Sequence, residues 1–208
     1  MKAIYTLIVL TIVLGLTGCS TSGDETMELA SDFDAVKAIY GLEEASMAVE
    51  NGTPSVTLKE MQSVLESLYS GSNIQRECVA IASDNGDKST FKIPMSGSYK
   101  TATRVGVSEE SFSLKVELKF SIEDGQVYYW GTDYTYSSNL FEWRANGLSL
   151  ASVKGMDYTY EFESRSYLYF KVVDEGDRVV RVPVIFGGNY NFETGKGTYH
   201  FQIIRYGK

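Results

Sequence analysis

The chain has 208 residues, of which 43% are hydrophobic, and its formal net charge at pH 7 is −8. This length and composition fit one domain with a sizeable apolar core. The acidic balance, with no basic cluster along the chain, excludes nucleic acid from the expected partners, because a negative surface repels a phosphate backbone.

The first residues, MKAIYTLIVLTIVLGLTGCS, have the pattern of a bacterial export signal. One lysine, Lys2, precedes an apolar and small-residue run over residues 3–16, which is shorter than the about 20 residues that a membrane-spanning helix needs. The run ends in Leu-Thr-Gly-Cys and resembles the lipobox of bacterial lipoproteins. This resemblance implies cleavage after Gly18 and lipidation of Cys19. Each buried methylene of an acyl chain contributes about 0.8 kcal/mol, so two or three chains anchor a protein firmly.

The residues after the cysteine bear on the location of such a lipoprotein. Ser20 replaces the aspartate that retains many lipoproteins in the inner membrane, so we expect the outer membrane, with its periplasmic and surface faces both open. The acidic pair Asp24 and Glu25 is similar to the surface-export signals of Bacteroidetes lipoproteins. The membrane is therefore an expected partner, bound through the lipid on Cys19.

The rest of the chain is predicted to divide into a tether and one domain. Residues 1–18 are the expected signal peptide, and residues 19–30 are small and polar, which favours a flexible tether. We expect a single globular domain over residues 31–208, with its helices within 32–70 and a β-meander over 75–206. No family is recognised in this domain from its residues.

Two amphipathic helices are predicted at the start of the domain. The first runs from Asp32 to about Glu50, with apolar residues at helical intervals, and ends at an Asn-Gly-Thr-Pro stretch. The second runs from Leu58 to about Tyr69. Thr57 and Glu60 have the spacing of a capping box at its start. Both helices need a surface against which to bury their apolar stripes.

From residue 75 onward the hydrophobic period changes to two. In SFSLKVELKFSIE (111–123) the apolar residues alternate with polar ones, as in an antiparallel strand with one wet face. Asp-, Asn- and Gly-rich turns separate about eight or nine such strands. We therefore predict an α+β fold in which two N-terminal helices pack on a mostly antiparallel β-meander, as a curled sheet or a partly open barrel.

Aromatic residues are concentrated in the second half of the chain. Eleven of the fifteen tyrosines lie from Tyr128 onward, and the sequence Asp-Tyr-Thr-Tyr occurs at both Asp133 and Asp157. For the second copy, alternation with the following strand predicts that Tyr158 and Tyr160 belong to the core. The first copy supplies part of a candidate ligand-binding stripe, which consists of Tyr128, Trp130, Tyr134 and Tyr136.

The side of the sheet that this stripe faces depends on the turn at Asp124-Gly125. A two-residue type I′ turn pairs Ile122 with Val127 and leaves the four aromatic residues exposed on the wet face. A three-residue turn with Gly125 in a bulge shifts the register by one and buries them. Turn chemistry favours the exposed register. We expect the buried one, because each buried aromatic side chain contributes about 1.5–3 kcal/mol.

No catalytic or metal-binding constellation is found. His200 is the only histidine and lies among polar strand residues, no G-x-S-x-G motif is present, and Cys78 in CVAIA reads as a core residue. No metal or other cofactor is expected. Glu161 and Glu163 share the polar face of a strand and keep a carboxylate-based hydrolase as the least favoured alternative.

The leading hypothesis is a lipid-anchored cell-envelope protein that is not an enzyme and that binds a ligand or partner. The aromatic stripe points to a glycan, because ring faces supply flat apolar area with polar edges. The main alternative is a structural or protein-interaction lipoprotein of an outer-membrane complex.

Overall fold

The computed structural model describes residues 32–45, 53–82, 90–101, 110–152 and 158–206, with backbone alone for 148–152. The helices are α2 (Phe33–Tyr40) and α3 (Leu58–Gly71), with a short 3-10 turn η1 (Val173–Glu175). Sheet A contains β1 (Glu43–Glu44), β2 (Ser55–Val56), β3 (Arg76–Val79), β8 (Glu142–Ser152), β9 (Thr159–Val172), β10 (Arg178–Asn191) and β11 (Lys196–Ile203). Sheet B contains β4 (Ile81–Ala82), β5 (Thr90–Lys100), β6 (Ser111–Glu123) and β7 (Gln126–Ser137).

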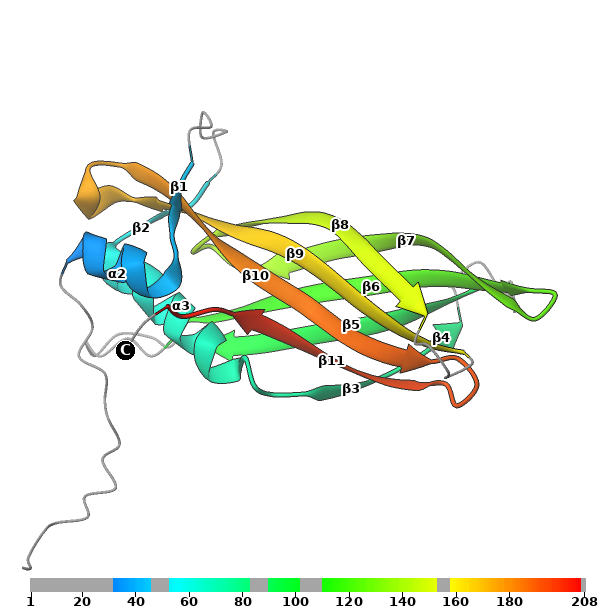
Figure 1. Cartoon of the computed structure of the whole chain (residues 1–208). Coiled ribbons are helices and arrows are strands. Elements are labelled where there is room, and N and C mark those ends of the chain that lie inside the picture. The colour runs from blue at the N-terminus through cyan, green and yellow to red at the C-terminus, as the bar shows by residue number, and fades with distance from the viewer. Residues whose placement is uncertain (1–31, 46–52, 83–89, 102–109, 153–157, 207–208) are drawn as a thin grey trace, which may run out of the picture.

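The predicted α+β fold with one curled sheet or partly open barrel is wrong. The described chain is mostly β, and its strands form two sheets, neither of them closed. Sheet A has the order β2-β9-β10-β11-β3, with β8 beside β9 and β1 beside β10, and sheet B has the order β4-β5-β6-β7. The sheets stack face to face (Figure 1). Ring contacts across the interface include Phe112–Phe141 at 5.2 Å and Phe120–Phe192 at 4.9 Å.

The chain changes sheets at two places that have no distinct local pattern. Ala80 alone separates β3 in sheet A from β4 in sheet B, and residues 138–141 join β7 in sheet B to β8 in sheet A. Alternation of apolar and polar residues indicates only that a strand has one buried face. The pattern is the same whether the next strand pairs with this strand in one sheet or packs against it from the other sheet. For this reason the sequence predicted one sheet where the protein has two.

Helix α3 is confirmed together with its capping box. The Glu60 amide donates to Thr57 Oγ1 at 3.2 Å, and the Thr57 amide donates to Glu60 Oε2 at 2.7 Å. Its apolar stripe is buried at one end of the sandwich, where α3 contacts β9 and β11 of sheet A and β5 of sheet B. The helix therefore closes one end of the core.

The first helix is shorter than predicted. α2 ends at Tyr40 because Gly41 adopts a left-handed conformation (φ 58°) and its amide bonds back to the Lys37 carbonyl. Residues 46–50 of the predicted helix lie outside the described residues. At the start, Asp32 is the N-cap, and its carboxylate accepts a hydrogen bond from the Asp34 amide at 3.1 Å.

The alternation of the long strands is largely confirmed. In β6 the residues from Phe112 to Phe120 alternate between buried and more exposed, and β9 buries Phe162, Leu168 and Phe170 on one face. Tyr158 departs from its predicted place in the core, since it is 48% exposed. It has a positive φ of 64° one residue before β9, so the alternation of the strand does not extend to it.

The arrangement gives the molecule two different ends. Helices α2 and α3 lie together at one end, and the β6–β7 hairpin reaches farthest from them at the other (Figure 1). Helix α3 lies at the end of the sandwich and does not cover a face of sheet B. The outer face of sheet B therefore carries polar side chains, among them Ser98, Lys115 and Asp133, all exposed. Within the described residues, no helix is long and apolar enough to cross a membrane.

Candidate functional site

The turn between β6 and β7 has the two-residue form. Asp124 and Gly125 both have positive φ, 49° and 75°, and Glu123 pairs with Gln126. This is the signature of a type I′ hairpin, whose twist matches that of the flanking strands. The expected three-residue turn with a bulge at Gly125 is therefore wrong.

A bulge inside β7 then changes the register. Lys119 pairs with Gly131 while its neighbour Phe120 pairs with Tyr129, so Trp130 is the extra residue. Beyond it, Val116 pairs with Tyr134, and the remaining pairs are regular. A bulge of this kind re-aims the side chains on one side of it relative to those on the other.

The bulge divides the predicted stripe into two pairs on opposite faces of sheet B. Tyr128, which pairs with Ser121, and Trp130, whose ring lies under the Lys119 ammonium, are on the outer face and are 46% and 53% exposed. Tyr134 and Tyr136 lie opposite the core residues Val116 and Leu114 and point inward. The sequence-predicted site residues therefore do not form one surface, and each of the two alternatives holds for half of them.

The outer pair is held in place by its neighbours. The Lys119 ammonium lies 5.3 Å from the centroid of the Trp130 ring and forms an ion pair of 2.6 Å with Asp133. The Tyr128 hydroxyl donates to Gln126 Oε1 at 2.9 Å. These contacts hold both rings in place on the surface. A ligand that stacks on them therefore costs little side-chain conformational entropy.

The inner pair belongs to the interface between the sheets. The Tyr134 hydroxyl donates to Ser164 Oγ at 3.2 Å, and its ring packs edge-on against Trp143 at 5.6 Å. Burial raises the pKa of Tyr134 above that of a free tyrosine. Tyr136 is 40% exposed at the margin of the interface and stacks on Phe141.

The same outer face carries a groove of about 470 Å³ across β5, β6 and β7. Its outward side chains are Pro94, Ser96, Lys115, Glu117, Asp133 and Thr135. Glu117 forms an ion pair of 3.4 Å with Lys92, as Asp133 does with Lys119. The hydroxyls, carboxylates and ammonium of this groove share one face of the sheet with two aromatic rings, and this combination suits a polyhydroxylated ligand. This groove was not predicted from the sequence, although the polar half of the β6 alternation was a signal for it.

A second groove, of about 510 Å³, crosses the outer face of sheet A. Glu163 pairs with Gly187, which pairs with His200, so the histidine and the carboxylate lie two strands apart, roughly 10 Å between Cα atoms. Glu161 also lines this groove. No hydrogen bond or ion pair joins these three titratable side chains to one another among the described residues, so the groove holds no assembled acid–base pair.

The remaining candidate residues have structural surroundings. Cys78 is buried, and burial raises the pKa of its thiol to about 11, so the thiol stays protonated at neutral pH. No group of three or more metal-ligating side chains occurs in the part of the chain that the structure describes. Cys19, with the predicted signal peptide and tether, lies outside the described residues.

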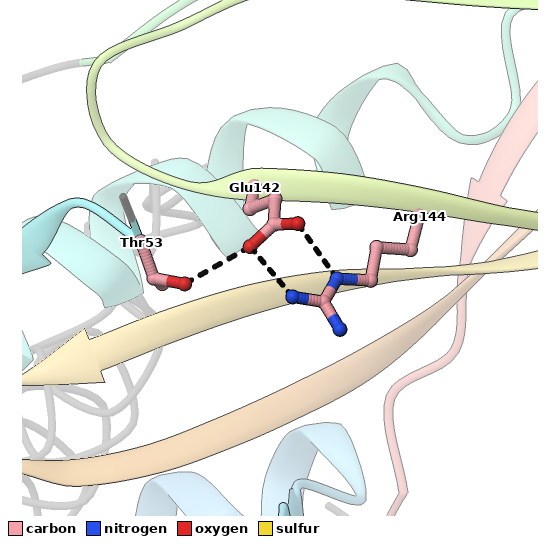
Figure 2. Close-up of polar contacts among 3 residues, drawn as sticks. All are labelled: Thr53, Glu142 and Arg144. Carbon is pink, nitrogen blue, oxygen red and sulfur yellow. Dashed lines mark hydrogen bonds and ion pairs between the residues drawn. The ribbon is translucent and has the colours of Figure 1, made fainter. Parts of the chain in front are cut away.

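One polar cluster links the segment before β2 to β8 (Figure 2). The Glu142 carboxylate accepts from Arg144 Nε at 2.6 Å, from Arg144 Nη2 at 3.1 Å and from Thr53 Oγ1 at 2.9 Å. The hydrogen bond from Arg144 is the main cause that holds the pKa of Glu142 below its usual value. The Arg144 guanidinium also lies 4.7 Å from the centroid of the Tyr169 ring. The cluster therefore connects β8, β9 and the segment before β2 within sheet A.

Comparison with known proteins places the chain in a family. No curated protein and no solved structure matches it. One family model matches residues 24–203, which is most of the chain and includes both sheets. The chain therefore belongs to the family described as "Domain of unknown function (DUF5033)".

Proposed function

We propose that this chain is a lipid-anchored protein of the bacterial cell envelope whose domain binds a glycan without catalysis. The observation that carries the proposal is the position of Tyr128 and Trp130 on the outer face of sheet B, the same face that carries the groove. Aromatic rings bind the apolar faces of sugars, and the groove supplies donors and acceptors for their hydroxyls.

Two features of the groove favour binding over catalysis. Glu117 and Asp133, its two carboxylates, are each paired with a lysine, at 3.4 and 2.6 Å. Both carboxylates are thus held by ion pairs, and no histidine lies among the described residues that line the groove. The same side chains remain good hydrogen-bond acceptors for sugar hydroxyls.

The anchor is supported by the Leu16–Cys19 motif after the apolar leader. Ser20 after the cysteine favours the outer membrane. We expect the wild-type chain to incorporate a labelled fatty acid in a bacterial host and to fractionate with membranes, and Cys19→Ser to do neither. Incorporation of label into the Cys19→Ser variant would contradict the assignment.

Binding is tested with a glycan array followed by titration of the best ligand. We expect Trp130→Ala and Tyr128→Ala each to weaken binding about tenfold, corresponding to the loss of roughly one stacked ring, with the melting temperature nearly unchanged. Tyr158→Ala is the matched control, because Tyr158 is similarly exposed but lies one residue before β9 of sheet A and not on β7. A large loss of stability in Trp130→Ala, or equal binding by all variants, would sink the proposal.

A further inference from the structure

β7 forms one edge of sheet B. It is last in the order β4-β5-β6-β7, and among the described residues it pairs with β6 alone. An edge strand presents a row of backbone N–H and C=O groups that another strand can bond. Natural proteins protect such edges with proline, lysine, short strands or covering groups.

The opposite side of sheet B shows this protection. β5 contains Pro94, which has no N–H to offer, and Lys92 and Phe91 are covered by β4. The Ser96 amide donates to the Tyr199 hydroxyl at 2.9 Å, and that hydroxyl donates to the Ser96 carbonyl at 2.8 Å. The β5 edge is thus closed to an added strand.

β7 has little of this protection. Its twelve residues include no proline and no lysine, and Asp133, its only charged residue, is neutralised by Lys119 at 2.6 Å. The bulge at Trp130 interrupts the edge, but from Thr132 to Ser137 the pairing with β6 is regular. A regular edge of six residues without net charge therefore has no second strand paired with it among the described residues.

The chemistry of this edge selects its occupant. Only an extended polypeptide has donors and acceptors that alternate at the spacing of a strand. Two copies of a chain with a net charge of −8 repel each other over most of their surfaces, and the neutral β7 edge avoids this repulsion. Antiparallel pairing of β7 with itself is also self-complementary about a twofold axis, so each copy satisfies the other.

We propose that β7 pairs antiparallel with β7 of a second copy of this chain, so that the two B sheets join into one continuous sheet. The twofold axis is perpendicular to the sheet and keeps both outer faces on the same side. Tyr128 and Trp130 of both copies then line one face. The pairing rests on the strand edge alone, and it stands or falls independently of glycan binding.

The pairing is tested by cysteine cross-linking of the full chain in host membranes. Single cysteines are placed at the outward positions Asp133, Thr135 and Ser137 of β7, and dimers are measured on non-reducing gels. Residues directly opposite across two antiparallel strands have Cβ atoms about 4.5–5.5 Å apart, within reach of a short bifunctional thiol reagent. Ser98→Cys, an exposed outward position on β5, gives the background from an exposed cysteine elsewhere on sheet B.

We expect dimer at twice the mass of the monomer on the same gel, strongest at one β7 position and weaker on either side of it. Thr135→Lys, combined with the best cysteine, should reduce the dimer at least tenfold, because it places two ammonium groups near the axis. Ser98→Lys is the matched control and should leave the dimer unchanged. Cross-linking at the β7 positions no stronger than with Ser98→Cys, or cross-linking to a protein of another mass, overturns the proposal. If Thr135→Lys fails to fold, the cysteine series alone decides.

Discussion

At the residue scale, Glu142 shows how one carboxylate joins segments that are far apart in the chain. It binds Arg144 two residues away on β8 and Thr53 before β2. Hydrogen bonds to an ionised group stabilise more than neutral ones, while partial exposure reduces the effect. The depressed pKa of Glu142 indicates that its ionised form is favoured in the folded state, chiefly by the bond from Arg144.

The stabilisation by Glu142 should therefore depend on pH. A carboxyl group whose pKa is lowered by folding stabilises the fold fully above its unfolded pKa, near 4.3, and loses that contribution as pH falls through the folded value. We expect Glu142→Gln to lower the free energy of unfolding by about 1 kcal/mol at pH 7. This difference should shrink steadily below pH 4.3. Urea unfolding at pH 7, 4 and 3 measures it.

Glu161→Gln serves as the control for this series. Glu161 lies on the outer face of β9, and no hydrogen bond or ion pair is found for its side chain among the described residues. Its substitution should change stability little at any of the three pH values. A difference for Glu142→Gln that stays constant from pH 7 to 3 would contradict the role given to the ionised carboxylate.

At the scale of the element, β7 satisfies two preferences that looked incompatible. Asp124-Gly125 favours a two-residue turn, and Tyr134 gains by facing the core. The bulge at Trp130 meets both, because it keeps the turn register near Gly125 and shifts the register beyond it by one residue. It also leaves Asp133 on the outer face, where Lys119 pairs with it. Alternation alone cannot locate such an extra residue, since both faces of β7 carry aromatic side chains.

At the scale of the molecule, tyrosine hydroxyls join the two sheets. Tyr199 of β11 bonds both backbone groups of Ser96 in β5, and Tyr190 of β10 accepts from the Ala80 amide at 2.9 Å, where the chain passes between sheets. Burial raises the pKa of Tyr190, which therefore remains a neutral hydroxyl at physiological pH. These bonds satisfy backbone groups that would otherwise lie unpaired beside the core.

Removal of one such hydroxyl should weaken the contact between the sheets. We expect Tyr199→Phe to lower the free energy of unfolding by about 1–3 kcal/mol, because the Ser96 amide and carbonyl both lose their partner. Tyr128→Phe, which removes an exposed hydroxyl, is the control and should change it by less than about 0.5 kcal/mol. Equilibrium urea unfolding of the two variants compares them. Equal stability of Tyr199→Phe and wild type would show that the hydroxyl does not stabilise the pairing of the sheets.

The sequence by itself determined the local features of this protein. The capping box of Thr57 and Glu60 places the start of α3, and the alternation over 111–123 places β6 and its buried face. Local turn chemistry at Asp124-Gly125 also favoured the type I′ turn that forms, although the expected gain from burying aromatic residues led to the wrong prediction of a three-residue turn. Each of these features depends on hydrogen bonds or periodicity among residues only a few positions apart, so the sequence shows it directly.

Only the tertiary structure decided which strands share a sheet and which aromatic residues reach the surface. The crossings at Ala80 and at 138–141, the bulge at Trp130 and the open edge of β7 all depend on strands that are distant in sequence. Their placement is set by how aromatic side chains from both sheets fill a common core, as where Tyr134 meets Trp143. That packing is a property of the folded molecule, because neither sheet has a buried face until the other covers it.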